Sequence, residues 1–217
     1  MNLKAINYLI FDLDGTLIDS SAGVVEATNY GLESIGENKR TPDEIKKFIG
    51  YPLDEMFHTF SKGSYDKFWE NFQKKGLEVI AAYSRPLDGA DDVLRELHQR
   101  GYIMGIATTK IRVHINRILD RFRWRNLFDG FIGADDVTSV KPHPEALLKL
   151  QRKIGGNHNN TLVIGDTEND VYAAHAADIP VIGLISSFGD NERLQQSQPD
   201  IILDNLGQLS DLLPGVS

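Results

Sequence analysis

Short apolar segments that alternate with helical patterns are the feature that most constrains the fold of this chain of 217 residues. Each segment is hydrophobic at nearly every position, as strands of a parallel sheet covered on both faces must be. Six of them occur, at residues 6–11, 102–107, 130–133, 161–165, 180–184 and 200–203. Amphipathic stretches with apolar residues at helical spacing lie between them, at residues 93–97, 111–122 and 146–150. The pattern predicts an α/β fold with a doubly wound, Rossmann-like parallel sheet.

One segment interrupts this alternation directly after the first predicted strand. Residues 16–85 separate that strand from the next core helix, and a connecting loop would need far fewer. Four apolar stripes at helical spacing run through the segment, centred on Val24, Ile45, Met56 and Phe68. We therefore expect a small α-helical cap domain at residues 16–85. It would be inserted into a core domain formed by residues 1–15 and 86–217.

Composition narrows the classes of function and partner. The chain has 23 basic and 31 acidic side chains, a net charge of −8, which argues against general binding to nucleic acid or anionic membranes. It has no cysteine, which excludes disulfides, thiolate zinc sites and cysteine nucleophiles. No apolar run approaches the roughly 20 residues of a membrane span, and the N-terminus lacks signal-peptide features. We expect a soluble, cytoplasmic protein, a monomer or homodimer, without nucleic-acid or membrane partners.

Other charged and titratable groups have simpler explanations. The basic residues of 117–125 are interleaved with apolar ones, which is typical of an exposed helix face. The six histidines show no ligand-like pairing with carboxylates, so we expect surface or helix-face positions for them. His143 is the exception that we keep as a candidate, since it lies two residues after Lys141.

Carboxylates gather where the predicted strands end. Asp12 and Asp14 follow the first strand, and Asp166 and Asp170 follow the strand at 161–165. In an open α/β sheet the carboxyl ends of the strands form the ligand-binding edge. Carboxylates crowded at one edge repel one another unless a divalent cation lies among them, and aspartate oxygens are ligands that Mg²⁺ selects. The spacing therefore predicts a magnesium site.

The same edge collects groups suited to phosphoryl transfer. An aspartate such as Asp12 can attack phosphorus and form an aspartyl-phosphate. Asp14, beyond a tight turn, can protonate the leaving oxygen and later deprotonate the attacking water. The Thr108 hydroxyl and the Lys141 ammonium can bind the equatorial phosphoryl oxygens. We place Thr109 with these two residues as a candidate substrate-binding group.

These motifs resemble the haloacid dehalogenase superfamily of aspartate-nucleophile phosphatases. Residues 12–17 match its first motif, Thr108 and Lys141 its second and third, and residues 165–170 its fourth. The order and spacing agree over essentially the whole chain, and the helical insertion lies where the family has its small cap. The stretch at residues 49–53 and the Phe188-Gly189 pair are most similar to the phosphoglycolate phosphatase-like branch. Thr109 stands where that branch often has Asn, and Asp178 where it often has Gly.

The resemblance implies a Mg²⁺-dependent phosphatase acting on a small phosphate monoester, either phosphoglycolate-like or a sugar phosphate. Asp12, Asp166 and the backbone carbonyl of Asp14 would hold the metal. Asp170 would be a ligand or a partner that hydrogen-bonds one. A phosphomutase of the β-phosphoglucomutase type uses the same core and stays an alternative. A hydrolytic dehalogenase shares the fold and the nucleophile, but it would leave Asp14 and the pair Asp166 and Asp170 unexplained. A non-catalytic phosphate-binding module would not need the complete set of catalytic residues.

Overall fold

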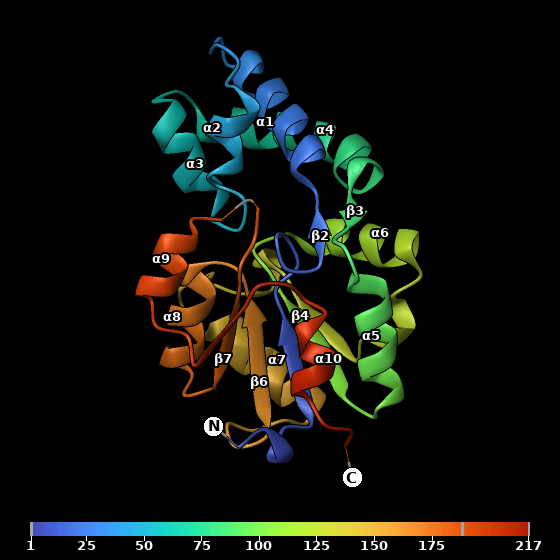
Figure 1. Ribbon diagram of the computed structural model, residues 1–217. Helices are drawn as coiled ribbons and strands as arrows, with labels where there is room; N and C mark the ends of the chain where they lie inside the picture. The colour runs from blue at the N-terminus through green and yellow to red at the C-terminus, as the bar shows by residue number, and fades with distance from the viewer. Residues whose placement is uncertain (1, 188, 217) are drawn as a thin grey trace.

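The computed structural model describes residues 2–187 and 189–216, so Phe188 of the Phe188-Gly189 pair lies outside the described residues. The six predicted strands form one parallel sheet in the order β5–β4–β1–β6–β7–β8 (Figure 1). Their bounds are Tyr8–Phe11 for β1, Ile103–Ala107 for β4, Gly130–Ile132 for β5, Thr161–Gly165 for β6, Val181–Leu184 for β7 and Ile201–Leu203 for β8. The predicted doubly wound α/β fold is confirmed, with β1 at its centre.

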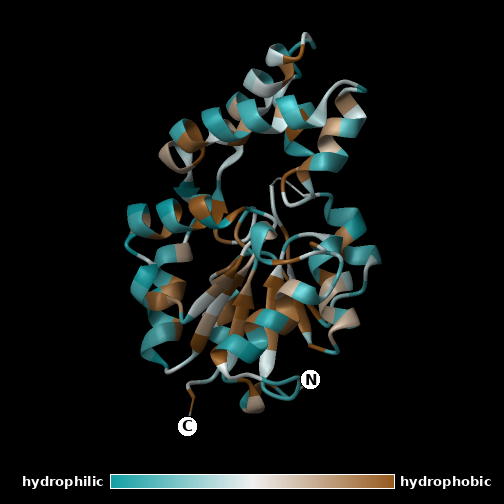
Figure 2. Cartoon of the chain, turned by 180° about the vertical axis from the view of Figure 1, so that it is seen from behind, coloured by the Kyte–Doolittle hydropathy of each residue, from teal (hydrophilic) through white to brown (hydrophobic). Residues whose placement is uncertain are grey.

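Helices cover both faces of this sheet because successive side chains of each strand point to opposite faces. Leu9 and Phe11 of β1 pack with helices α5, α6 and α10, whereas Ile10 between them packs with α7, α8 and α9. The helices are α5 at Ala90–Gln99, α6 at Arg112–Phe122, α7 at Glu145–Ile154, α8 at Glu168–Ala176, α9 at Asn191–Gln196 and α10 at Gln208–Leu212. Figure 2 shows hydrophobic strands inside and hydrophilic residues on the surrounding helices. Two cores thus fix the strands and the loops at their ends.

The segment after β1 folds as four helices, which we call the cap helices. They are α1 at Ser21–Ser34, α2 at Pro42–Lys46, α3 at Leu53–Phe60 and α4 at Tyr65–Tyr83. They have a core of their own, in which Phe57 and Phe68 are fully buried. Thr41 caps α2: its side chain accepts from Glu44 N at 3.3 Å, and Glu44 Oε2 accepts from Thr41 N at 2.8 Å. The helical insertion is confirmed as a feature of the fold.

A short antiparallel ribbon connects these helices to the sheet. Strand β2, Ile18–Asp19, pairs with β3, Arg85–Pro86, so the chain enters and leaves the cap helices side by side (Figure 1). The Arg85 guanidinium lies 3.0 Å from Asp19 Oδ2 across the ribbon. The sequence did not predict these strands, because two residues are too few for a strand pattern.

Three smaller expectations concern the surface and a turn. Arg117, Arg121, Arg123 and Arg125 are all exposed, as expected, but α6 ends at Phe122, so only Arg117 and Arg121 lie on a helix face. Asp178 stands where the phosphoglycolate phosphatase-like branch often has glycine. Its φ of 54° lies in the left-handed region, which glycine adopts most easily. Within the described residues, no helix is long and apolar enough to cross a membrane.

Candidate active site

The central strand brings the predicted site residues together. Phe11 of β1 pairs with Ile106 of β4 on one side and with Ile164 of β6 on the other. Asp12 therefore emerges beside the ends of both neighbours, and its backbone N–H donates to the Ile164 carbonyl at 2.8 Å. Asp12, Thr108 and Asp166 follow these three strands and are all buried. The prediction that they share one edge of the sheet is confirmed.

Lys141 lies between two carboxylates at this edge. Its Nζ donates to Asp12 Oδ1 at 2.6 Å, to Asp170 Oδ1 at 2.5 Å and to the Ala107 carbonyl at 3.1 Å. The residue is 2% exposed. A charged lysine is almost never so buried unless it is paired. The ammonium is thereby fixed directly beside the candidate nucleophile.

Burial and nearby charges shift the pKa values of Asp12, Asp166 and Lys141. Burial raises the pKa of Asp12 to about 7; Lys141 opposes this effect and Asp170 adds to it. Burial also raises the pKa of Asp166 well above its usual value, and the nearby charges of Asp12 and Asp170 raise it further. Burial lowers the pKa of Lys141, but the two carboxylates outweigh it, and its pKa lies above the ordinary value. The cluster therefore carries unfavourable negative charge that a cation would relieve.

The acidic residues fit a divalent cation. Carboxylate oxygens of Asp12, Asp166 and Asp170 lie within 4.8 Å of one another, and all three residues are buried. Thr16 Oγ1 donates to Asp166 Oδ1 at 3.0 Å and so orients that carboxylate. Gly15, at φ of 78°, lets the main chain pass close by, since a Cβ there would lie 1.9 Å from Asp166 Oδ2. Hard oxygen donors in such a buried group suit Mg²⁺.

The two oxygens of Asp170 are both in use. Oδ1 accepts from Lys141, and Oδ2 accepts from Thr167 N at 3.1 Å and from Thr167 Oγ1 at 2.7 Å. A Cβ at Gly165 would lie only 2.3 Å from Asp170 Cγ, so glycine makes room for this side chain. These contacts support a role for Asp170 in positioning Lys141.

Asp14 faces a different set of partners. Ser20 Oγ donates to its Oδ1, and Lys110 Nζ lies 3.0 Å from its Oδ2. Lys110 Nζ also donates to Ser20 Oγ at 3.1 Å. Asp14 is thus held separately from the Asp12–Lys141 pair, as two different chemical roles would require.

The two threonines after β4 diverge. Thr108 is buried next to Ala107, whose carbonyl accepts from Lys141, and the Thr108 hydroxyl accepts from Lys110 N at 3.4 Å. Thr109 instead donates from Oγ1 to the Gly50 carbonyl of the cap at 3.4 Å. Thr108 therefore lies with the predicted catalytic groups, whereas Thr109 lies where the core meets the cap helices.

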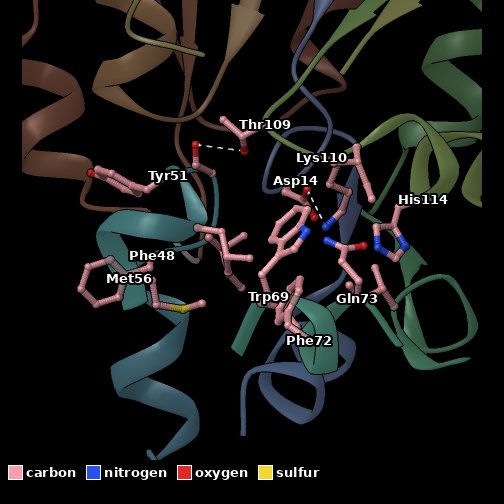
Figure 3. Close-up of a pocket in the computed structure, with 16 residues that line it drawn as sticks. Asp14, Phe48, Tyr51, Met56, Trp69, Phe72, Gln73, Thr109, Lys110 and His114 are labelled. Atoms are coloured by element: carbon pink, nitrogen blue, oxygen red, sulfur yellow. Dashed lines mark hydrogen bonds and ion pairs between the residues drawn. The ribbon is translucent and has the colours of Figure 1, made fainter. Parts of the chain in front are cut away.

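A pocket lies between the cap helices and the core. It is a cavity of about 80 Å³ and is lined by residues of both parts, Asp14, Thr109 and Lys110 of the core among them. In Figure 3, Trp69 and Gln73 of α4 and His114 of α6 surround the Asp14–Lys110 pair. Tyr51, which also lines the pocket, donates from its hydroxyl to Glu168 Oε1 at 2.7 Å, which connects the stretch at residues 49–53 to α8.

Sequence reasoning missed several of these residues. Lys110 and Ser20 were not predicted as site residues, although Lys110 directly follows Thr109. His114 was expected at a surface or on a helix face; it is on α6, but it is 2% exposed and so is not a surface residue. Its position among Ile111, Ile115 and Ile118, at helical spacing, was the available signal.

Known proteins share this architecture. The family described as haloacid dehalogenase-like hydrolase matches residues 9–184. The pyrophosphatase PpaX of Anoxybacillus flavithermus is 30% identical over 96% of this chain and 97% of its own length. The phosphoglycolate phosphatase of Photobacterium profundum is 28% identical over 97% and 96%. A solved haloacid dehalogenase-like hydrolase from Bacteroides fragilis is 31% identical, with a TM-score of 0.88 over 94% of this chain and 99% of that one.

The chain therefore belongs to the haloacid dehalogenase-like hydrolases and is a phosphatase of that family. This membership confirms the resemblance drawn from the motifs at residues 12–17, at Thr108 and Lys141, and at residues 165–170.

Proposed function

We propose that the protein is a Mg²⁺-dependent phosphatase that hydrolyses a small phosphate monoester through an aspartyl-phosphate on Asp12. The observation that carries this proposal is the placement of two aspartates two residues apart. Asp12 is buried against Lys141, and Asp14 lines the pocket between core and cap helices. The names of the relatives, a pyrophosphatase and a phosphoglycolate phosphatase, support phosphate chemistry at this site.

In the first half of the reaction, an Asp12 carboxylate oxygen forms a bond to phosphorus while the bond from phosphorus to the leaving oxygen breaks. Lys141, beside Asp12, would bind a phosphoryl oxygen together with the Thr108 hydroxyl. Asp14 gives its proton to the leaving oxygen, since it faces the pocket where that group would lie. Ser20 and Lys110 hold the Asp14 carboxyl in this direction.

In the second half, a water molecule attacks the phosphorus of the aspartyl-phosphate. Asp14 now takes a proton from that water, the bond between phosphorus and Asp12 breaks, and inorganic phosphate leaves. Asp12 returns to its carboxylate form beside Lys141. The same carboxyl group therefore acts first as acid and then as base.

Asp12, Asp166 and the backbone carbonyl of Asp14 would hold the metal ion. The close passage of Gly15 against Asp166 supports the carbonyl as a ligand. A bound Mg²⁺ would neutralise the carboxylates and draw charge from the phosphoryl oxygens. We assign Asp170 to positioning Lys141 and Thr167, because both of its oxygens accept hydrogen bonds from these residues.

We assign residues 16–85 to a cap that closes over the site, and residues 1–15 and 86–217 to the catalytic core. The cap supplies α1, α3 and α4 residues to the pocket and a hydrogen bond from Tyr51 to the core. Closure would exclude bulk water from the aspartyl-phosphate and place the leaving group against Asp14. A small phosphorylated metabolite in the cytoplasm is the substrate class that such an enclosed site fits.

Phosphate release from 4-nitrophenyl phosphate and from a panel of phosphorylated metabolites tests the proposal. We expect release with Mg²⁺, none in excess chelator, recovery on adding Mg²⁺, and poor recovery with Ca²⁺, whose larger shell suits in-line transfer badly. Full turnover in chelator would contradict the metal assignment. Formation of a sugar-phosphate isomer without free phosphate would make the protein a phosphomutase instead.

A further inference from the structure

The cap pocket, the cavity between the cap helices and the core, has a composition that bears on substrate choice. It starts at Asp14, the group that would protonate the leaving oxygen, so whatever fills it is bonded to that oxygen. Most of its wall is hydrocarbon or aromatic, contributed by residues such as Val24, Leu53, Met56, Trp69, Phe72 and Ile111. A wall of this kind favours an apolar occupant over a strongly hydrated one.

The charged groups that line the pocket neutralise each other. Among its lining residues, all of which are in the described part of the chain, Lys110 is the one with an ammonium or guanidinium group. That ammonium lies 3.0 Å from Asp14 Oδ2 and donates to Ser20 Oγ at 3.1 Å (Figure 3). A carboxylate or phosphate on the leaving group would therefore have to compete with Asp14 and Ser20 for this ammonium.

His114 does not supply that cation. Both ring nitrogens are buried and have no hydrogen-bond partner among the described residues. The pKa of His114 is lowered to about 3, mainly by burial and in addition by the positive charges of Lys110 and Arg117. The imidazole is neutral at pH 7 and can accept or donate one hydrogen bond to an uncharged group.

The remaining polar atoms of the wall are already bonded elsewhere or uncharged. Thr109 donates to the Gly50 carbonyl, and the Tyr51 hydroxyl donates to Glu168. Gln73 of α4 offers a neutral amide. Moving an anion into such surroundings is unfavourable, because its lost hydration is not replaced unless it finds a partner.

We propose that this site takes phosphate monoesters whose leaving group is compact, uncharged and mainly apolar, and that it discriminates against leaving groups that end in a carboxylate or a phosphate. This inference rests on the proposed function, since it concerns the alcohol side of the same reaction. It separates this chain from relatives named for phosphoglycolate and pyrophosphate, whose leaving groups are anionic.

The test compares two esters of similar shape and different charge. Isobutyl phosphate has a branched methyl pair where 2-phosphoglycolate has its carboxylate oxygens. We expect kcat/KM for isobutyl phosphate to exceed that for 2-phosphoglycolate at least about tenfold in the wild-type protein with Mg²⁺. Inorganic pyrophosphate should also be a poor substrate.

A charge placed in the pocket should reverse the preference. Gln73→Lys puts an ammonium in the wall, and we expect it to lower the ratio of the two kcat/KM values at least about tenfold, through better use of 2-phosphoglycolate. Gln73→Met has similar length and no charge, and it should keep the wild-type order. If Gln73→Lys does not fold, the wild-type ratio still decides the question.

The outcomes are separable. An equal or higher kcat/KM for 2-phosphoglycolate in the wild-type protein overturns the inference while leaving the phosphatase intact; it would mean that Lys110 leaves Asp14 to bind the substrate's charge. An unchanged ratio in a folded Gln73→Lys variant also counts against it. Failure to release phosphate from any ester, 4-nitrophenyl phosphate included, overturns the proposed function and the inference with it.

Discussion

The proposed catalytic cluster and the cap pocket lie next to each other and differ in how much charge they bury. The catalytic cluster, made of Asp12, Lys141, Asp166 and Asp170, buries several charges within a few ångströms. The cap pocket is mainly apolar, and its one ammonium is paired with Asp14. Asp14 is at the boundary between the two. Charge is concentrated where bonds would break and is nearly absent where the leaving group would be recognised.

This difference separates the residues that would carry out phosphoryl transfer from those that would select the leaving group. Burying charges close together is energetically costly, so we expect it only where those charges act on the phosphoryl group. The pocket, in contrast, can change the residues that come from the cap helices without disturbing the cluster, because those helices have a separate core. Substitutions in the two regions should therefore have different consequences.

The largest effect is expected from removing the proposed nucleophile. Asp12→Asn should lower kcat by at least about 10⁴-fold for every ester, whatever its leaving group, because no aspartyl-phosphate can form. Steady-state phosphate release across alkyl and aryl esters measures this. Asp92→Asn, at an exposed position of α5, is the matched control and should keep wild-type rates. A loss confined to some esters would place Asp12 in recognition instead of chemistry.

Removing the buried ammonium should affect stability as well as activity. Lys141→Met leaves Asp12 and Asp170 without their shared partner, and we expect the free energy of unfolding to fall by about 3–5 kcal/mol. Lys149→Met breaks a more exposed pair with Glu145 and should lower the free energy of unfolding far less. Urea denaturation of both variants without metal gives the comparison. Equal losses would mean that the buried cluster is not held together by Lys141.

The smallest effect concerns the cap pocket and pH. The pKa of His114 is lowered to about 3 in the folded protein, whereas an unfolded chain has an ordinary histidine. Between pH 6.5 and 3 the unfolded state therefore binds an extra proton, and folding stability is lost as pH falls. Full stability from this residue is present above pH 6.5.

A variant without the imidazole should respond less to pH. Between pH 7 and pH 5, the free energy of unfolding of His114→Gln should fall by up to about 2 kcal/mol less than that of the wild type. Urea denaturation at several pH values measures the two slopes. Parallel slopes would show that His114 takes up a proton in the folded protein as readily as in the unfolded chain. The inference that the imidazole in the pocket is neutral would then be wrong.

The sequence predicted the catalytic cluster more fully than the cap pocket, for a physical reason. Strand ends converge by the geometry of a parallel sheet, so Asp12, Thr108 and Asp166 could be placed together from their positions alone. The pocket joins α1, α3 and α4 to α6, and no local pattern states how helices from two parts will face each other. The two-residue ribbon strands and the pairing of Lys110 with Asp14 likewise depend on tertiary contacts.

Some of what was missed had a signal. His114 lies in the apolar stripe of α6 with Ile111, Ile115 and Ile118, which indicates burial whatever the polarity of the ring. Among the aromatic residues of the cap helices, Phe57 and Phe68 pack in the core of those helices. Trp69 and Phe72 also line the pocket.

The central claim is that Asp12 carries the phosphoryl group while Asp14 moves protons, and trapping the phospho-enzyme tests it most directly. Asp14→Asn keeps the nucleophile, and an activated aryl ester needs no proton to leave. Rapid-quench kinetics should then give a burst of one phosphoryl group per chain, with peptide mass spectrometry locating it on Asp12. Turnover after the burst should be slower than in the wild type by about 10²–10⁴-fold, since the attacking water lacks its base. A burst from Asp12→Asn, or a phosphate found on any other residue, would contradict this account.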